Sequence, residues 1–180
     1  MEVVLHTCCG PCASACVKRL QDENSKVVMY FSNSNIDSRE EFERRAAAAK
    51  KLAAADGVEI IIDEYRHEAW LKAVKGLENE PERGKRCAAC FRFNIARAAE
   101  FAKKRGIAKV TSSLTVSPHK SSARVFAAGD EVAGDMFLHE DFKKKDGFLC
   151  SIRRTKELNL YRQSYCGCEF SKCRGESAAK

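Results

Sequence analysis

Three cysteines near the amino terminus constrain this chain more than any other stretch. Cys8, Cys9 and Cys12 follow a short apolar run at residues 3–5, which predicts a β-strand, and they precede apolar residues at helical spacing: Ala13, Cys16, Val17 and Leu20. Pro11 suits the first position of that helix, because proline has no N–H to lose there. Cys12 then lies in the first helical turn, where the helix dipole favours a thiolate. Thiolates bind metals and attack disulfides, so this strand-to-helix turn predicts a functional site.

The composition predicts a single soluble domain in a reducing compartment. The chain has 180 residues, of which 44% are hydrophobic and 32% charged. We expect one domain over residues 1–180, with an α/β core over 1–141 and a dependent carboxyl-terminal cover over 142–180. No signal peptide and no membrane-spanning apolar run is recognised, which predicts a cytoplasmic protein without a membrane partner. Ten cysteines in such a compartment favour metal-binding or redox roles over structural disulfides.

The charge is consistent with a nucleic-acid partner. The formal net charge is +7, and basic residues cluster at 103–105, 143–145 and 153–154. Such clusters suit phosphate binding. Simple solubility explains them equally well, so charge alone does not choose between the two interpretations.

The order of the predicted elements indicates an α/β fold. Continuous apolar runs at 26–32, 58–62 and 109–114 predict buried strands that alternate with helical patterns. Ser38 and Glu41 have capping-box spacing, and Gly57 and Gly106 follow the predicted ends of two helices. A short helix over 68–75 and a short strand near 136–139 are also expected. The fold class is therefore a Rossmann-like three-layer sandwich with a mostly parallel sheet. From about Phe142 onward, the basic and aperiodic sequence predicts a helical and loop cover over the functional edge.

A second cysteine pair points to a shared metal centre. Cys87 and Cys90 also open a predicted helix, so two pairs at helix starts on one sheet could converge. All-thiolate coordination suits either zinc or an iron–sulfur cluster, and the spacing does not separate them. Cys9 and Cys12 alone would match the dithiol of a thiol-disulfide oxidoreductase. Their position directly after the first strand argues against the thioredoxin fold.

The remaining candidates leave alternatives open. Cys166 and Cys168 could form a small strained disulfide ring, or they could be two unrelated thiols beside a turn glycine. His119 lies in a loop after a strand and could contact substrate or simply be solvated. Cys16 and Trp70 are expected to be packing residues. Asp63 is expected either to contact a ligand or to pair with Arg66. Cys150 and Cys173 receive no role.

Six motifs follow one another in order along residues 5–171. The first four are Cys8-Cys9-x-Pro11-Cys12, Asn33-x-Asn35-Ile36, Lys75-Gly76-Leu77-Glu78 leading to Arg86-Cys87-x-x-Cys90, and Ser117-Pro118-His119-Lys120. The last two are Asp141-Phe142-Lys143-Lys144-Lys145 and Tyr161-Arg162-Gln163-x-Tyr165-Cys166-Gly167-Cys168. Together they resemble one family, the QueH-type epoxyqueuosine reductases. Gly10 stands where alanine is common in the family, and Ser34 where proline is common.

The resemblance implies an oxidoreductase that completes queuosine biosynthesis by reducing epoxyqueuosine in tRNA anticodons. Carried over by position, Cys8, Cys9, Cys87 and Cys90 match the ligands of a [4Fe-4S] cluster. Cys166 and Cys168 match the family's redox-active disulfide pair, and Cys12 is the candidate ligand of an additional iron or zinc. The implied partners are tRNA carrying epoxyqueuosine and an external electron donor. The candidate substrate-binding residues are His119, Lys120, Lys143, Lys144 and Lys145.

Two other functions remain as alternatives to this reading. One is a zinc-stabilised RNA-binding module. The other is a thioredoxin-like oxidoreductase that uses Cys9 and Cys12.

Overall fold

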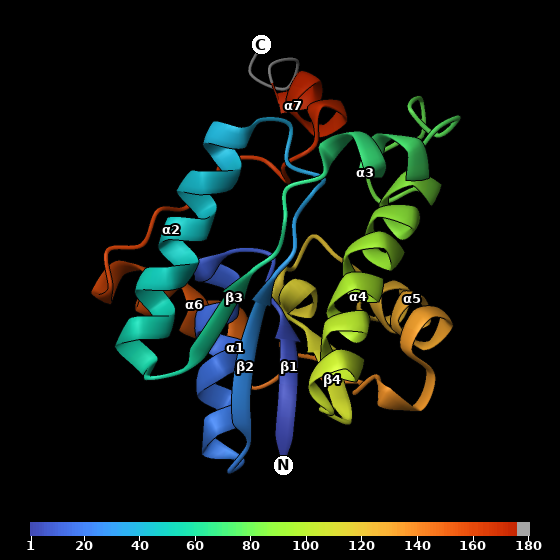
Figure 1. Ribbon diagram of the computed structural model, residues 1–180. Helices are drawn as coiled ribbons and strands as arrows, with labels where there is room; N and C mark the ends of the chain where they lie inside the picture. The colour runs from blue at the N-terminus through green and yellow to red at the C-terminus, as the bar shows by residue number, and fades with distance from the viewer. Residues whose placement is uncertain (176–180) are drawn as a thin grey trace.

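A four-stranded parallel sheet forms the centre of the molecule (Figure 1). The computed structural model describes residues 1–175, with side chains through residue 172. The strand order is β3-β2-β1-β4, and all three pairings are parallel. The strands are β1 (Glu2–His6), β2 (Lys26–Phe31), β3 (Glu59–Ile62) and β4 (Lys109–Ser112). This sheet confirms the predicted α/β class.

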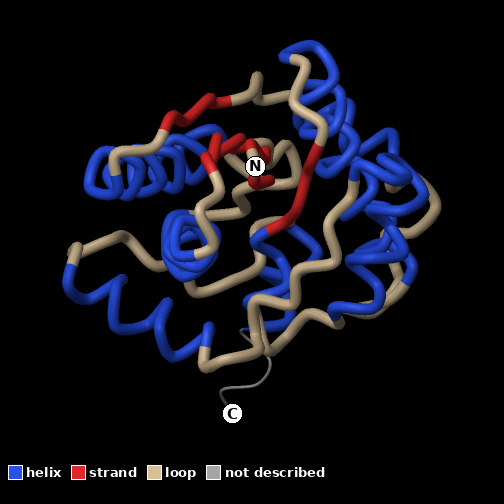
Figure 2. The backbone as a smooth tube through the Cα atoms, turned by 90° about the horizontal axis from the view of Figure 1, so that it is seen from below, coloured by secondary structure: helices blue, strands red, loops and turns tan. Residues whose placement is uncertain are grey.

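Helices cover both faces of the sheet, which gives the three layers visible in Figures 1 and 2. On one face lie α1 (Gly10–Asp22), α2 (Arg39–Asp56) and α6 (Gly147–Glu157), and on the other lie α4 (Lys85–Arg105) and α5 (Ser122–Ala133). The shorter elements are α3 (His67–Ala73), α7 (Glu169–Gly175) and the 3-10 turns η1 (Ser113–Val116) and η2 (Gly134–Met136). No helix in the described part of the chain is both long and apolar enough to cross a bilayer.

The alternation of side chains along β1 builds the two halves of the core. Val3 and Leu5 pack with α1 and α2, whereas Val4 packs with α4 and α5 on the opposite face. All three side chains are fully buried. Because β1 and β2 are covered on both faces, their sequences are nearly continuous apolar runs rather than alternating ones.

The predicted helix ends are observed. The Ser38 hydroxyl accepts a hydrogen bond of 3.2 Å from the Glu41 N–H at the start of α2. Gly57 and Gly106 adopt left-handed conformations, with φ of 63° and 70°, where α2 and α4 end. Left-handed backbone favours glycine because it has no Cβ.

Gly10 allows α1 to approach α2 closely. A Cβ atom at this position would lie 2.8 Å from the backbone oxygen of Ala48. An alanine at this position would therefore require α2 to move away from the cysteine turn.

The prediction of a short strand near residues 136–139 is wrong. This segment forms one isolated bridge between Val110 and Phe137, and the Leu138 N–H donates to the Val110 carbonyl over 2.8 Å. The turn η2 directly precedes it, so the chain touches the edge of β4 without extending the ladder. The carboxyl-terminal cover is observed as expected: α6 packs on α1, and residues 162–166 line a cavity at the carboxyl edge of the sheet.

Candidate active site

The cysteine turn lies where the chain changes direction within the sheet. β1 is flanked by β2, which follows it through α1, and by β4, which the chain reaches from β3 through α4, so the strand order reverses at β1. Such switch points leave a crevice at the carboxyl ends of the strands, where α/β proteins bind ligands. Here the Cys8 N–H donates a 3.0 Å hydrogen bond to the Ser113 hydroxyl, which lies directly beyond β4. That hydroxyl also donates to the Cys8 sulfur over 3.3 Å.

Cys8, Cys9 and Cys12 form a compact group of thiols. Their sulfur atoms all lie within 4.8 Å of one another. Cys9 is fully buried and caps α1, because its sulfur accepts a hydrogen bond from the Cys12 N–H. Hydrogen bonds from the Cys12 and Cys8 thiols lower the pKa of Cys9, while hydrogen bonds to Cys8 and Cys9 raise the pKa of Cys12. The group therefore favours one shared thiolate, which is a good ligand for a metal.

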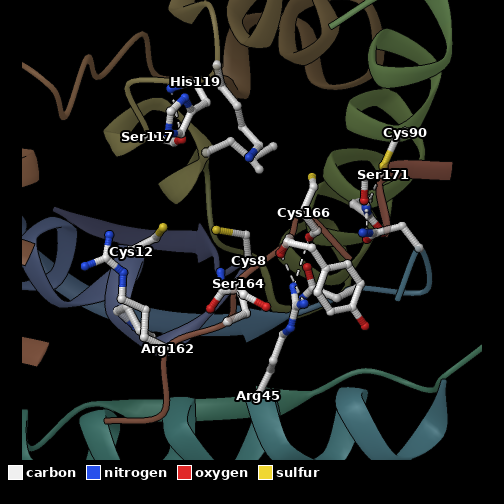
Figure 3. A pocket seen from close by; sticks show the side chains of 18 of the residues that line it. Cys8, Cys12, Arg45, Cys90, Ser117, His119, Arg162, Ser164, Cys166 and Ser171 are labelled. Atoms are coloured by element: carbon white, nitrogen blue, oxygen red, sulfur yellow. Dashed lines mark hydrogen bonds between the residues drawn. The ribbon is translucent and has the colours of Figure 1, made fainter. Parts of the chain in front are cut away.

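A cavity of about 840 Å³ opens above this group. Cys8 and Cys12 line it from one side and Cys90 from another, with Cys166 between them in the view of Figure 3. Its polar lining includes Asn33, Asn35, Arg45, Asn94, Lys120, Arg162 and Gln163. The structure thus brings cysteines from three distant segments to a single cavity.

Cys87 and Cys90 lie in the first two turns of α4, but they are not part of the compact thiol group. The Cys87 sulfur accepts a 3.2 Å hydrogen bond from the Arg83 N–H, and the Asn94 amide donates to the Cys90 sulfur over 3.6 Å. Burial raises the pKa of both thiols. Cys87 lines a second cavity of about 300 Å³, which shares Cys166 with the first.

Cys166 and Cys168 are held in a tight turn. Gly167 has a φ of 138°, and a Cβ there would lie 3.1 Å from the Asn35 amide nitrogen. Its carbonyl accepts a 2.9 Å hydrogen bond from the Asp37 N–H. Cys166 faces the cavities, whereas Cys168 is only 8% exposed and packs near Trp70. Both thiols are free in this structure.

A buried ion pair on α2 supports this turn and was missed by sequence reasoning. Glu41 and Arg45 are joined by a 2.7 Å contact, and their side chains are 8% and 2% exposed. Arg45 then donates to the carbonyl oxygens of Tyr165 and Cys166, while the Tyr161 hydroxyl donates to Glu41. The detectable signal was two opposite charges four residues apart on the buried, alanine-rich face of α2.

His119 and Lys120, both predicted to bind substrate, line the large cavity. Burial lowers the pKa of Lys120, but Coulombic interactions with the surrounding cysteines, Cys166 foremost, raise it by more, so the net shift is upward. Lys120 therefore carries its positive charge beside the thiols. His119 is exposed at the rim, and its Nδ1 lies 3.3 Å from the Arg83 guanidinium.

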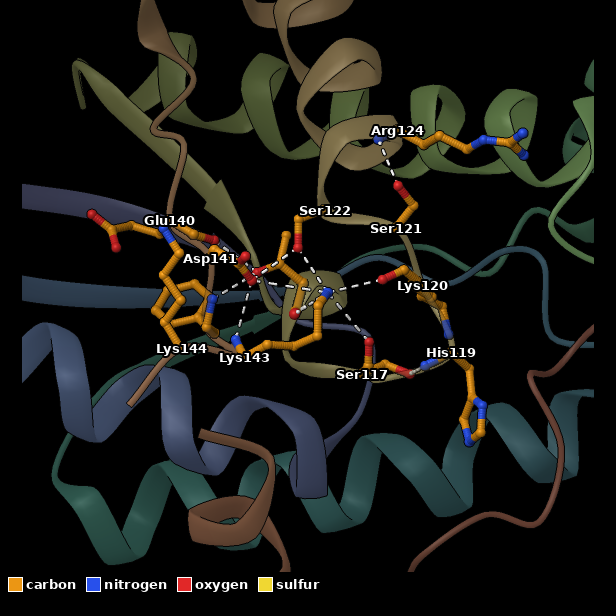
Figure 4. A network of polar contacts seen from close by, with 12 residues as sticks. Ser117, His119, Lys120, Ser121, Ser122, Arg124, Glu140, Asp141, Lys143 and Lys144 are labelled. Carbon is orange, nitrogen blue, oxygen red and sulfur yellow. Dashed lines mark hydrogen bonds and ion pairs between the residues drawn. The ribbon is translucent and has the colours of Figure 1, made fainter. Parts of the chain in front are cut away.

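Lys143 has a different environment from the two lysines that follow it (Figure 4). Its ammonium donates to the carbonyl oxygens of Thr115 and Lys120 over 3.0 and 2.9 Å and to the Ser122 hydroxyl over 2.7 Å. Lys143 thereby fixes the loop that carries Lys120. The side chains of Lys144 and Lys145 are exposed and do not share these contacts.

Three of the remaining candidates are structural, and so is His6, which belongs to no motif of the sequence. Cys16 and Trp70 are fully buried packing residues, as predicted. Asp63 pairs with Arg97 of α4, with a 2.7 Å contact to its Nη2, rather than with Arg66. His6 is buried between Ser112 and the carbonyl of Ser32.

The other two unassigned cysteines still have no role. Cys150 is half-buried beside the α1 and α2 core, and the side chain of Cys173 lies outside the described part.

The donor set fits an all-thiolate centre. Three thiols already lie within 4.8 Å of one another, and among the described residues this compact group contains no ligand atom other than sulfur. Cys90 lines the same cavity. Soft sulfur donors select zinc, copper(I) or iron–sulfur clusters over hard cations such as magnesium.

Comparison with known proteins shows which family this chain is similar to. The profile described as "Epoxyqueuosine reductase QueH" matches residues 3–174. A protein of that name from Streptococcus pyogenes serotype M1 is 33% identical over 179 residues, which cover 94% of this chain and 70% of the relative. A protein of the same name from Thermotoga maritima is 33% identical over 175 residues, covering 94% of this chain and 89% of the relative.

Proposed function

This chain belongs to the QueH family of epoxyqueuosine reductases, and on that premise we propose that it reduces epoxyqueuosine in tRNA to queuosine. The reaction removes the epoxide oxygen: two electrons and two protons convert the epoxide to an alkene and release water. One observation carries the proposal, namely that thiols from three segments converge on a single cavity at the switch point of the sheet. The cytoplasm, where tRNA resides, is the proposed compartment.

We assign the ligands of a [4Fe-4S] cluster to Cys8, Cys9, Cys87 and Cys90. Cys12 is the candidate ligand for an adjacent iron or zinc, because its sulfur lies within 4.8 Å of those of Cys8 and Cys9. When bound, such a centre supplies single electrons and a Lewis acid for the departing oxygen. The chain contributes enclosure, since Cys9 is fully buried, and a hydrogen bond from Ser113 to the Cys8 sulfur.

Cys166 and Cys168 are proposed to deliver the reducing equivalents. Oxidation of two thiols to one disulfide releases two electrons and two protons, which matches the requirement of epoxide reduction. An external donor, such as a dithiol, would then reduce the disulfide and become oxidised itself. Cys166 is suited to this task because it lines both cavities and approaches the metal-ligand candidates.

The chain's polar residues are proposed to hold the substrate in the cavity. Lys120 keeps a positive charge beside the thiols, and the amides of Asn33, Asn35 and Asn94 offer hydrogen bonds to a polar nucleoside. A base in a single-stranded anticodon loop is accessible to such a cavity without disruption of a duplex.

The direct test uses tRNA that carries epoxyqueuosine. The anaerobically purified protein is incubated with this tRNA and dithionite, and the digested nucleosides are examined by mass spectrometry. We expect epoxyqueuosine to be replaced by queuosine, with the loss of one oxygen atom. Unchanged epoxyqueuosine, with an intact metal centre and tRNA binding, would reject the proposed activity.

A second test addresses the thiol pair. Cys166→Ser and Cys168→Ser are expected to retain wild-type iron content and to lose multiple turnover when a dithiol is the reductant. Cys150→Ser provides a matched control, because Cys150 lies outside both cavities. Loss of iron in either test variant would show that the residue is a metal ligand instead.

A further inference from the structure

The second, smaller cavity has a concentration of unpaired positive charge. It lies between the turn that precedes α4 and the loop that enters α5, and the cations Arg83, Lys120 and Arg124 line it together with His119. Glu82 is the one carboxylate in this lining among the described residues. Because Arg83, His119, Lys120 and Cys166 also line the 840 Å³ cavity, the smaller cavity is a side pocket of the larger one.

The cations of this side pocket differ from others on the same helices. Arg92 pairs with Glu131, Lys104 with Glu100, and Arg105 with Glu59. In contrast, Arg83, Lys120 and Arg124 form no ion pair with any carboxylate of the described residues. Cations gathered around a concavity without paired carboxylates create a positive potential that attracts an anionic ligand.

The hydrogen-bonding groups of the pocket suit a phosphate. The Arg83 Nη2 lies 3.3 Å from the Nδ1 of His119, and a guanidinium has only donors, so this Nδ1 accepts. With Nδ1 as the acceptor, the Nε2–H group of His119 is a further donor. Two guanidinium groups, an imidazole N–H and an ammonium together match the acceptor oxygens of a phosphodiester.

We propose that this side pocket binds a backbone phosphate of single-stranded RNA next to the nucleotide whose base enters the larger cavity. The inference rests on the proposed function and concerns the protein contact that would position the RNA in the active site. A nucleoside inserted beside the thiols carries its flanking phosphates to the mouth of the cavity. The side pocket shares that mouth through Arg83 and His119.

Affinity for RNA at several salt concentrations tests the site. The double variant Arg83→Gln/Arg124→Gln is compared with Lys18→Gln/Lys26→Gln, which removes the same formal charge at exposed positions that line neither cavity. Unmodified tRNA serves as the probe, so the measurement does not depend on the reduction. We expect the first variant to raise Kd about tenfold. The slope of log affinity against log salt should fall by about 0.7 for one lost phosphate contact. The control should differ little from the wild type.

A phosphate scan locates the contact. Anticodon-loop RNAs with one neutral methylphosphonate at each successive position are bound to the wild type and to the Arg83/Arg124 variant. One position beside the wobble nucleotide should weaken wild-type binding about tenfold but leave the variant unaffected, because the variant has already lost that contact. Equal losses in both proteins at every position, or unchanged affinity and slope in the variant, would overturn the proposed site. The proposed function is judged separately, by whether the wild type reduces epoxyqueuosine.

Discussion

Arg45 donates a 2.9 Å hydrogen bond to the backbone carbonyl of Cys166 and so connects α2 to the turn that carries the proposed redox pair. The guanidinium also stacks under the Tyr165 ring, with 5.0 Å from Cζ to the ring centroid. Glu41 holds the other side of the guanidinium. Arg45 is thus a positioning residue for Cys166, because it contacts the backbone and not the thiol.

Arg45→Lys should loosen this turn while it retains the charge that buried Glu41 needs. An ammonium cannot reproduce the planar arrangement of donors, so hydrogen bonds to the two carbonyls are lost. We expect a loss of about 1.5 to 3 kcal/mol in unfolding free energy. We also expect a changed ratio of disulfide to dithiol for Cys166 and Cys168 in a glutathione buffer. Urea unfolding and differential alkylation measure the two effects.

Arg44→Lys is the matched control for this change. Arg44 is the adjacent residue, but it is half exposed, pairs with the exposed Glu40 over 2.8 Å and approaches Glu41 only to 3.6 Å. The two carbonyls of the turn are contacted by Arg45 instead. Its replacement should cost under about 0.5 kcal/mol and leave the thiol ratio unaltered. If Arg44→Lys and Arg45→Lys shift the thiol ratio equally, the support of the turn by Arg45 is refuted.

Lys143→Met should disturb the loop that carries Lys120. The variant loses charge-assisted hydrogen bonds to Thr115, Lys120 and Ser122, which predicts a loss of about 1.5 to 3 kcal/mol in stability. Lys144→Met, at an exposed position, should leave stability within about 0.5 kcal/mol of the wild type. Denaturant midpoints compare them, and equal midpoints would contradict the role assigned to Lys143.

The lowered pKa of Asp63 predicts that the stability of the protein depends on pH. Burial raises the pKa of Asp63, but hydrogen bonds from Arg97, Ser32 and Tyr30 lower it by more, so the folded-state pKa lies below the ordinary value. The resulting stabilisation is complete above about pH 4, the pKa region of an unfolded aspartate, and is lost as the pH falls through the folded-state pKa.

Asp63→Asn should therefore cost more at neutral pH than in acid. At pH 7 we expect a loss of about 3 kcal/mol, since Arg97 remains partly buried without its carboxylate. At pH 3 the difference from the wild type should be smaller. Asp22→Asn, which removes an exposed carboxylate paired with Lys18, should show little effect at either pH. A pH-independent cost at Asp63 would disprove the assigned shift in its pKa.

Local patterns predicted the sheet and the cysteine turn because apolar runs, caps and helix-ending glycines act within a few residues. Ser38, Gly57 and Gly106 are examples, and their roles are confirmed. The same reasoning placed a strand at 136–139, where β propensity is present but only one bridge to Val110 forms. Whether a segment joins a ladder depends on distant packing that its own sequence does not record.

The site was less predictable where a residue's role depends on tertiary contacts. Lys143, Lys144 and Lys145 are identical in type and adjacent in sequence, yet Lys143 alone turns into the loop before α5. Arg45 is 121 residues from Cys166 and belongs to no cysteine motif. Cys8, Cys9 and Cys12 could be grouped from sequence because one turn holds them all, whereas the approach of Cys90 and Cys166 to their cavity depends on the whole fold.

Iron and sulfide analysis of the anaerobically purified chain tests the central claim most directly. We expect brown protein with iron and sulfide in the ratio of a [4Fe-4S] cluster. Cys8→Ser, Cys9→Ser, Cys87→Ser and Cys90→Ser should each lose most of this iron, while Cys150→Ser should keep it. Colourless wild-type protein that holds zinc alone, or full iron content in the Cys87 and Cys90 variants, would contradict the account.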